Sequence, residues 1–193
     1  IDNMRKSRQA KAAKKAGNIA ADGAIIIAQD GNKTLMLEVN SQTDFVAKDD
    51  GFTGFVKLVA QAIADGNPAD VEALADVATA SGETVEAVRK ALIAKLGENI
   101  TVRRFVRYTT EGRAAAYLHG AKIGVVVCMA GDDGEAGKHV AMHIAASRPA
   151  CVDESGVPPE MVEREREIQI DIAMQSGKAR EIAEKMVVGR MKK

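Results

Sequence analysis

The sequence predicts an α+β protein with two related subdomains, each a small antiparallel sheet packed with helices, plus an antiparallel helical hairpin (coiled coil). Residues 22–64 and 114–147 share one order of elements, which is strand, turn, strand and helix. From residue 157 onward the apolar spacing is helical on both sides of a Ser-Gly break. The expected division is a basic linker helix, a first core subdomain, a second core subdomain and the hairpin: 1–18, 19–110, 111–150 and 151–193.

The composition excludes several classes of protein. A chain of 193 residues with 46% hydrophobic and 28% charged residues can bury a core and is ordinary for a globular protein. Its 27 basic and 27 acidic residues cancel, so no net charge draws it to nucleic acid or membrane. No apolar run could span a bilayer, and Cys128 and Cys151 form no CxxC pair, which favours a reducing cytosol. The chain begins with Ile1, so we expect a piece of a longer protein.

Residues 1–18 are expected to form a helix that ends near Gly17, because alanine and lysine favour helix. One acid, Asp2, stands against six basic residues: Arg5, Lys6, Arg8, Lys11, Lys14 and Lys15. We interpret this segment as a solvated basic linker helix. The alternative is a contact to ribosomal RNA or to an acidic partner.

The first core subdomain begins with two apolar runs around the turn residues QDGNK, which predict a β-hairpin. A helix should follow and stop before Gly66. Five of its apolar residues recur at helical spacing and should share a buried face: Phe52, Phe55, Val56, Val59 and Ile63.

Residues 67–97 are expected to be helical, with Ser81 as a cap and Gly97 closing the last turn. The stretch NITVRRFVRYT then predicts an alternating strand. The residues that should face inward are Ile100, Val102 and either Phe105 or its neighbours.

After residue 157, Pro158 and Pro159 should start a helix that Ser176 and Gly177 end. The next helix carries Ile182, Met186 and Met191, with Ala183 and Val187 beside them. Two helices around a tight turn form an antiparallel hairpin. Its apolar stripe needs cover from the other helix or from another molecule, so the hairpin is a candidate surface for a homo-oligomer.

The sequence offers little catalytic chemistry. GDDGEAGKH resembles a phosphate-binding loop superficially, but Asp132 stands where that motif needs glycine and His139 where it needs a hydroxyl. His139 and His143 have the spacing of zinc ligands, with His119 as a candidate third, yet Val140 replaces the glutamate of a metalloprotease. No Ser-His-Asp arrangement or carboxylate pair is evident. We therefore expect no metal site and regard an enzyme as the weaker class.

The segment TDFVAKDD places Phe45 among charged residues where a strand gives way to a helix. Local spacing alone favours a core position, because Phe45 precedes Phe52 by seven residues and one unbroken helix would place both on one face. Asp49 and Asp50, however, are typical of a helix cap and a break. If the helix begins there, Phe45 lies in a connecting loop, where an exposed aromatic residue is a candidate for binding a partner.

The segment EVNSQTDFVAKDD closely resembles the internal signature of the elongation factor Ts family, the guanine-nucleotide exchange factors of elongation factor Tu. The resemblance covers almost the whole chain. The family pattern also has an amino-terminal helical domain and sequence beyond the hairpin, which this sequence lacks. Further matching segments are AKAAKKAGNIAADG, KLGENI, HGAKIGV, HVAMHIAAS and DIAMQSGKAREIAEKMVVGRMKK.

The resemblance implies a cytoplasmic exchange factor and not an enzyme. It implies no cofactor of its own, since the factor acts on the GDP and Mg²⁺ bound by its partner, elongation factor Tu. In the family the Asp-Phe pair of this motif enters the GTPase domain, where the phenylalanine wedges between helices, disturbs the Mg²⁺ site and loosens GDP. This assigns partner binding and Mg²⁺ dislocation to Thr43, Asp44, Phe45 and Val46.

The resemblance assigns three further residues to the partner interface: Leu96, Gly97 and His119. Many relatives have isoleucine in place of Leu96, and His119 would touch a different domain of the partner. No membrane and no direct nucleic-acid contact are expected. One alternative function is a ribosome- or RNA-associated binding protein that uses the basic start, and another is a metal-dependent hydrolase built on the three histidines.

Overall fold

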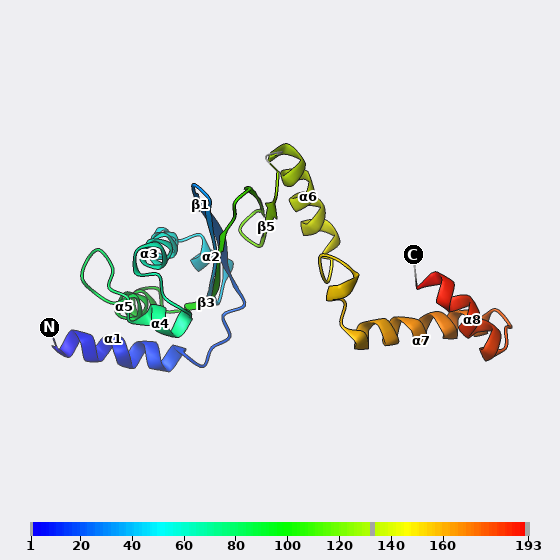
Figure 1. The fold of residues 1–193 in the computed structure, drawn as a ribbon. Coiled ribbons are helices and arrows are strands. Elements are labelled where there is room, and N and C mark those ends of the chain that lie inside the picture. Colours follow the sequence, from blue (N-terminus) through cyan, green and yellow to red (C-terminus); the bar gives the residue numbers. More distant parts are fainter. Residues whose placement is uncertain (1, 132–133, 192–193) are drawn as a thin grey trace. The chain divides into compact units, whose positions relative to one another are not determined.

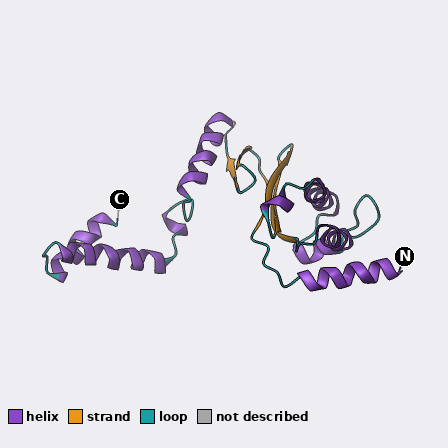
Figure 2. Cartoon of the chain, turned by 180° about the vertical axis from the view of Figure 1, so that it is seen from behind, coloured by secondary structure: helices purple, strands orange, loops and turns teal. Residues whose placement is uncertain are grey.

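The computed structural model describes residues 2–131 and 134–191 and divides the chain into two units, Ile1–Ser147 and Arg148–Lys193. The α+β class is confirmed, because a three-stranded and a two-stranded antiparallel sheet pack with helices (Figures 1 and 2). Both sheets belong to the first unit, and the subdomain boundary expected between 110 and 111 stays a prediction. Some expectations rest on residues or side chains outside the described part: Asp132, Asp2, Arg5 and Arg8.

The first sheet has the strand order β1-β2-β3. The expected hairpin is confirmed by β1 (Asp22–Asp30) and β2 (Lys33–Ser41), which pair antiparallel along their whole length. Gly31 lies in the turn with a φ of 55°, in the left-handed region that glycine adopts at little cost. β3 (Thr101–Thr109) returns from a distant part of the sequence to pair antiparallel with β2.

A β-bulge changes which residues of β3 face the core. The register shifts between Glu38 and Val39, whose partners are Arg104 and Val102, so one residue of β3 has no opposite partner. Val102 and Phe105 therefore both pack toward the core although they lie three residues apart. Their inward orientation confirms the sequence-based expectation, and the bulge explains how a strand with a two-residue period achieves it.

One face of the sheet is covered by α3 (Asp50–Gly66) (Figure 1). The helix includes Gly66, one residue beyond the expected end, and Asn67 closes it in a left-handed conformation with a φ of 45°. The buried face contains the five predicted residues and Ala62: Phe52, Phe55, Val56, Val59, Ala62 and Ile63. Two helices follow it, α4 (Val71–Ala75) and α5 (Val85–Leu96).

The caps of these two helices differ in part from expectation. Asp70 caps α4 and Thr84 caps α5, each accepting a hydrogen bond from a backbone N–H of the first turn. The expectation that Ser81 is a cap is wrong, because its hydroxyl bonds that of Thr79 at 2.9 Å, in the turn before α5. Gly97 closes α5 as expected, with a φ of 79°.

The basic first helix, α1 (Asp2–Lys15), packs against α5. Ala12 is only 4% exposed and belongs to the main core. The expectation of a helix surrounded by solvent is therefore wrong on this face. A residue as small as alanine lets the two helices approach closely. Lys6, Lys11 and Lys14 remain exposed on its surface.

The second sheet consists of β4 (Arg113–His119) and β5 (Ile123–Met129), followed by α6 (Gly134–Ser147), which packs against both strands. This is the expected order of strand, turn, strand and helix. The β4–β5 hairpin is joined to β1, since the N–H of Ile25 donates to the carbonyl oxygen of Ala121 at 2.8 Å.

The second unit contains the helical hairpin. α7 (Pro159–Gln175) packs against α8 (Arg180–Arg190), after a short 3₁₀ turn at Glu154–Gly156. The apolar residues of the last segment divide into two sets. Ala183, Val187 and Met191, four residues apart, pack against α7, whereas Ile182 and Met186 are exposed. None of the helices in the described ranges is long and apolar enough to cross a membrane.

Candidate partner-binding site

Phe45 lies on a single helical turn, α2 (Asp44–Ala47), and not in an extended loop. Thr43 caps this turn, because its hydroxyl accepts a hydrogen bond from the N–H of Val46 at 3.4 Å. Asp49 then caps α3, accepting from the N–H of Gly51 at 2.7 Å. The two caps separate α2 from α3, so Phe45 and the core residues of α3 do not belong to one continuous helix.

The side chain of Phe45 is 82% exposed, so the core interpretation is wrong and the outward orientation is confirmed. Val46 and Ala47 turn the other way and pack against the main core. A helix advances about 100° per residue, so a single turn can bury one side and present the other. The role of Phe45 in binding stays a prediction.

Asp44 and Lys48 form an ion pair beside Phe45, with Lys48 Nζ 2.8 Å from Asp44 Oδ2. The hydrogen bond and the charge of Asp44 raise the pKa of Lys48 above its ordinary value. Both side chains are substantially exposed, so water screens the attraction and the pair adds little to stability. Asp44 therefore remains available to a second cation or donor.

Leu96 and Gly97 end α5 close to this turn. Leu96 is partly buried against the main core, and the exposed Gly97 donates its N–H to the carbonyl oxygen of Ile93 at 2.8 Å. The next residue, Glu98, contacts Thr43 with both carboxylate oxygens, one at 3.0 Å from the backbone nitrogen and one at 2.7 Å from the hydroxyl oxygen. The structure thus brings the TDFV and KLGEN segments together.

His119 belongs to a different sheet. It ends β4, is exposed, and has its Nδ1 3.1 Å from the hydroxyl oxygen of Tyr117. His139 and His143 are exposed on α6. Within the described residues, no three His, Cys, Asp or Glu side chains are grouped so that they could hold a metal ion.

Sequence reasoning missed the polar side chains that hold the site. Gln42 Oε1 accepts from the N–H of Asn99 at 2.8 Å and from the side-chain amide of Asn18 at 3.1 Å. Asn99, which is buried, also donates from its side chain to the carbonyl oxygen of Asn18 at 2.8 Å. The bonds of Glu98 and Asn99 join segments more than 50 residues apart, which no local period in the sequence reveals.

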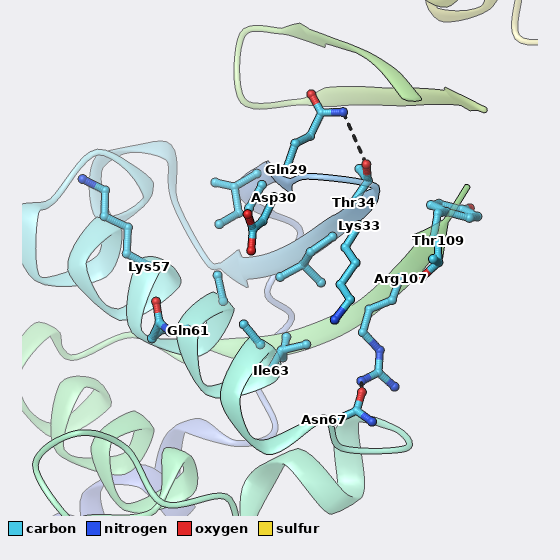
Figure 3. A pocket seen from close by; sticks show the side chains of 16 residues that line it. Gln29, Asp30, Lys33, Thr34, Lys57, Gln61, Ile63, Asn67, Arg107 and Thr109 are labelled. Atoms are coloured by element: carbon cyan, nitrogen blue, oxygen red, sulfur yellow. Dashed lines mark hydrogen bonds between the residues drawn. The ribbon is translucent and has the colours of Figure 1, made fainter. Parts of the chain in front are cut away.

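A groove of about 790 Å³ lies between α3 and the turn end of the first sheet (Figure 3). Its floor is mainly aliphatic, and Lys33, Lys57 and Arg107 stand at its edges. Arg107 is already engaged, because its guanidinium donates to the side chain of Asn67 and to the carbonyl oxygen of Pro68. None of the residues predicted for partner binding lines this groove.

Comparison with known proteins gives one consistent family. The family model described as Elongation factor TS matches residues 42–193. Elongation factor Ts of Psychrobacter sp. (strain PRwf-1) is 52% identical over 193 residues, which are 100% of this chain and 66% of that protein. The proteins of the same name from Actinobacillus succinogenes and Aliivibrio fischeri (strain MJ11) are each 55% identical over 193 residues, 100% of this chain and 65% of theirs. This chain thus spans about two thirds of the length of the relatives it matches, and it belongs to the elongation factor Ts family.

Proposed function

We propose that this chain binds elongation factor Tu and accelerates the release of its GDP, acting as a guanine-nucleotide exchange factor in the cytoplasm. The observation that carries the proposal is the exposure of Phe45, 82%, on a capped turn inside the family match. An apolar ring of this size, left in water beside a folded core, is the kind of residue that dominates a protein interface.

The chain needs no acid, base or cofactor of its own for this work. An exchange factor must bind the nucleotide-free GTPase more tightly than the GDP-bound one, and the coupling is then reciprocal. Phe45 enters the GTPase domain, with Asp44 beside it, and disturbs the Mg²⁺ site. Because Mg²⁺ offsets the phosphate charge, its displacement weakens GDP binding.

The other predicted contacts fit the same surface. Gly97 is exposed at the end of α5, and Glu98 ties that end to the turn that carries Phe45. Leu96, Gly97 and the Thr43–Val46 turn would therefore meet the GTPase domain together. His119, carried by β4 of the second sheet, would reach another domain of the partner.

The test is the release of fluorescently labelled GDP from elongation factor Tu, chased with unlabelled GDP, with and without a catalytic amount of this chain. The chain should accelerate release, and Phe45→Ala should remove most of the acceleration. Ile19→Ala is the matched control, because Ile19 is similarly exposed at 84% but is not among the residues predicted to contact the partner. It should accelerate release as the unaltered chain does.

A second arm tests the route through Mg²⁺. Chelating Mg²⁺ speeds spontaneous release, so the relative acceleration by this chain should shrink. Equal release rates with and without the chain, while the two proteins form a complex, would contradict the proposed function. An acceleration that ignores Mg²⁺ would contradict the displacement step alone.

A further inference from the structure

We propose that Glu98 is a positioning residue for exchange: it fixes the single turn that presents Phe45 and couples it to the end of α5. The inference rests on the proposed function, because positioning matters only if Phe45 enters the partner. Glu98 itself is partly buried and bonds to Thr43, two residues before Phe45. Neither the periodicity of the sequence nor the family signature around TDFVAKD points to it.

The contact between Glu98 and Thr43 decides how the turn is capped. One carboxylate oxygen accepts from the N–H of Thr43 at 3.0 Å and the other from its hydroxyl at 2.7 Å. A threonine hydroxyl has one proton and two lone pairs. Because the proton points to Glu98, a lone pair remains for the N–H of Val46, whose bond to that oxygen caps α2.

A second pair of residues supports the first. Gln42 precedes Thr43, Asn99 follows Glu98, and the N–H of Asn99 donates to Gln42 Oε1 at 2.8 Å. Two consecutive residues after β2 are thus bonded to two consecutive residues after α5. The left-handed conformation of Gly97 turns the chain at the end of α5, immediately before these two residues.

The turn has little stability of its own, so these bonds and the core packing of Val46 and Ala47 hold it. α2 contains four residues, and an isolated helix this short does not form in water. Phe45 cannot hold itself in place, since the residue is 82% exposed. A side chain that is already oriented loses less conformational freedom on binding, so fixing the turn favours productive insertion.

The first experiment compares Glu98→Ala, Phe45→Ala and the double variant in the labelled-GDP assay. Glu98→Ala should lower the chain-dependent rate of release about tenfold, and in the Phe45→Ala background it should cause no further loss. If Glu98 only stabilised the fold, Glu98→Ala would lower the rate of release by the same factor with and without Phe45→Ala. Glu98→Gln keeps one acceptor oxygen and should fall between the unaltered chain and Glu98→Ala. Glu83→Ala, at an exposed glutamate without a side-chain partner in the described residues, is the matched control.

The second experiment needs no partner. The chain has no tryptophan, so Phe45→Trp introduces a single fluorescent reporter at the site. Its time-resolved anisotropy should show little fast local motion, and Glu98→Ala in the same background should add such motion while Glu83→Ala should not.

The outcomes separate the two proposals. Unchanged anisotropy after Glu98→Ala would overturn the positioning role, whatever the exchange rate. Full exchange activity of Glu98→Ala, in a chain that does accelerate GDP release, would also overturn it and leave the proposed function intact. If the unaltered chain does not accelerate release but the anisotropy responds, the proposed function fails and Glu98 still holds the turn.

Discussion

Phe45 and Phe52 lie seven residues apart, yet the first is 82% exposed and the second is completely buried. Thr43 caps one helix and Asp49 caps the next, so the chain changes direction between the two rings. The pair offers a direct comparison, because the same truncation at each position removes the same atoms from opposite environments.

We predict that Phe52→Ala lowers the melting temperature by roughly 10 °C and that Phe45→Ala leaves it nearly unchanged. Truncating a buried phenylalanine costs about 3–5 kcal/mol, and each 1 kcal/mol shifts melting by roughly 2–4 °C at this size. In the GDP-release assay Phe45→Ala should have the larger effect of the two variants. Loss of a hot-spot contact of about 2–4 kcal/mol slows release roughly thirty- to several-hundred-fold. A large fall in the melting temperature of Phe45→Ala, with normal GDP release per folded molecule, would refute the proposed insertion of Phe45 into the partner.

Asp49→Ala should destabilise the first unit by about 1 kcal/mol, the usual cost of losing an N-cap. Asp49 Oδ1 accepts from the N–H groups of Gly51 and Phe52 at 2.7 and 3.4 Å, and the second of these residues belongs to the core. Urea unfolding followed by circular dichroism measures the change. Asp50→Ala is the control, since Asp50 is exposed in the first turn and does not cap the helix. An equal loss in both variants would show that charge near the helix start, and not the cap, is responsible.

Much of the fold could be predicted from the sequence because long periodic segments bury one face. The face of α3 from Phe52 to Ile63 and the hairpin around Gly31 follow from spacing and turn residues. Ser81 was a wrong cap because several Ser, Thr and Asp residues near a helix start compete, and only the local backbone path decides among them. That path makes Thr84 the cap of α5.

The site was predicted in part. Local spacing favours a core position for Phe45, and its outward orientation was predicted only because Asp49 and Asp50 are typical of a cap and the family resemblance supports a loop. The one-turn helix is too short to show a period of its own. Glu98 could not be found, because its partner Thr43 is 55 residues away and polar tertiary contacts leave no trace in hydrophobic patterning. The sequence left open which apolar residues of α8 face α7, because helix rotation is fixed by the packing of the two helices and not by composition, and the structure leaves Ile182 exposed.

Two helical glycines should respond to alanine in opposite directions. Gly54→Ala should stabilise the chain by about 0.5–1 kcal/mol, because a Cβ there meets no atom within 4 Å and helical glycine is unfavourable. Gly137→Ala should destabilise it by roughly 1–3 kcal/mol, because a Cβ would lie 2.7 Å from that of Ala115 and would also overlap Met129. Thermal unfolding of both variants checks this. Stabilisation by Gly137→Ala would mean that α6 can shift away from the β4–β5 hairpin.

Glu86 should make stability depend on pH in the acid range. Partial burial acts to raise the pKa of Glu86, but the hydrogen bonds and charges of Arg89 and Lys90 outweigh it and hold the pKa below its ordinary value. The unfolded chain therefore takes up this proton at a higher pH than the folded chain does. The stabilisation is complete above the ordinary carboxyl range, about pH 4–5, and is lost as the pH falls through the folded pKa.

The measurement for Glu86 is the free energy of unfolding in urea from pH 3 to pH 7. The difference between the unaltered chain and Glu86→Gln should be largest near neutrality and shrink on acidification. Glu83→Gln, at an exposed glutamate, should show no such trend. If the difference in free energy of unfolding between the unaltered chain and Glu86→Gln grew as the pH fell, the lowered pKa of Glu86 would be contradicted.

The histidines should not bind zinc stoichiometrically. His139 and His143 are exposed on α6, and no third ligand stands with them among the described residues. After dialysis against zinc and then buffer, elemental analysis should find well under one zinc per chain. A full equivalent that disappears in His143→Ala would refute this expectation.

The bulge opposite Glu38 and Val39 is the place where β3 can lose one residue without turning its core-facing side chains outward. On one side of the bulge an even-numbered residue, Val102, faces the core, and on the other side an odd-numbered one, Phe105, does. Removing Arg103, which has no opposite partner in β2, would restore simple alternation and leave both Val102 and Phe105 facing the core, whereas removing a residue elsewhere in the strand would turn the residues beyond it to the other face. A single deletion should therefore be accepted at the bulge and rejected in the regular parts of the strand, a pattern that comparison of its homologues can reveal.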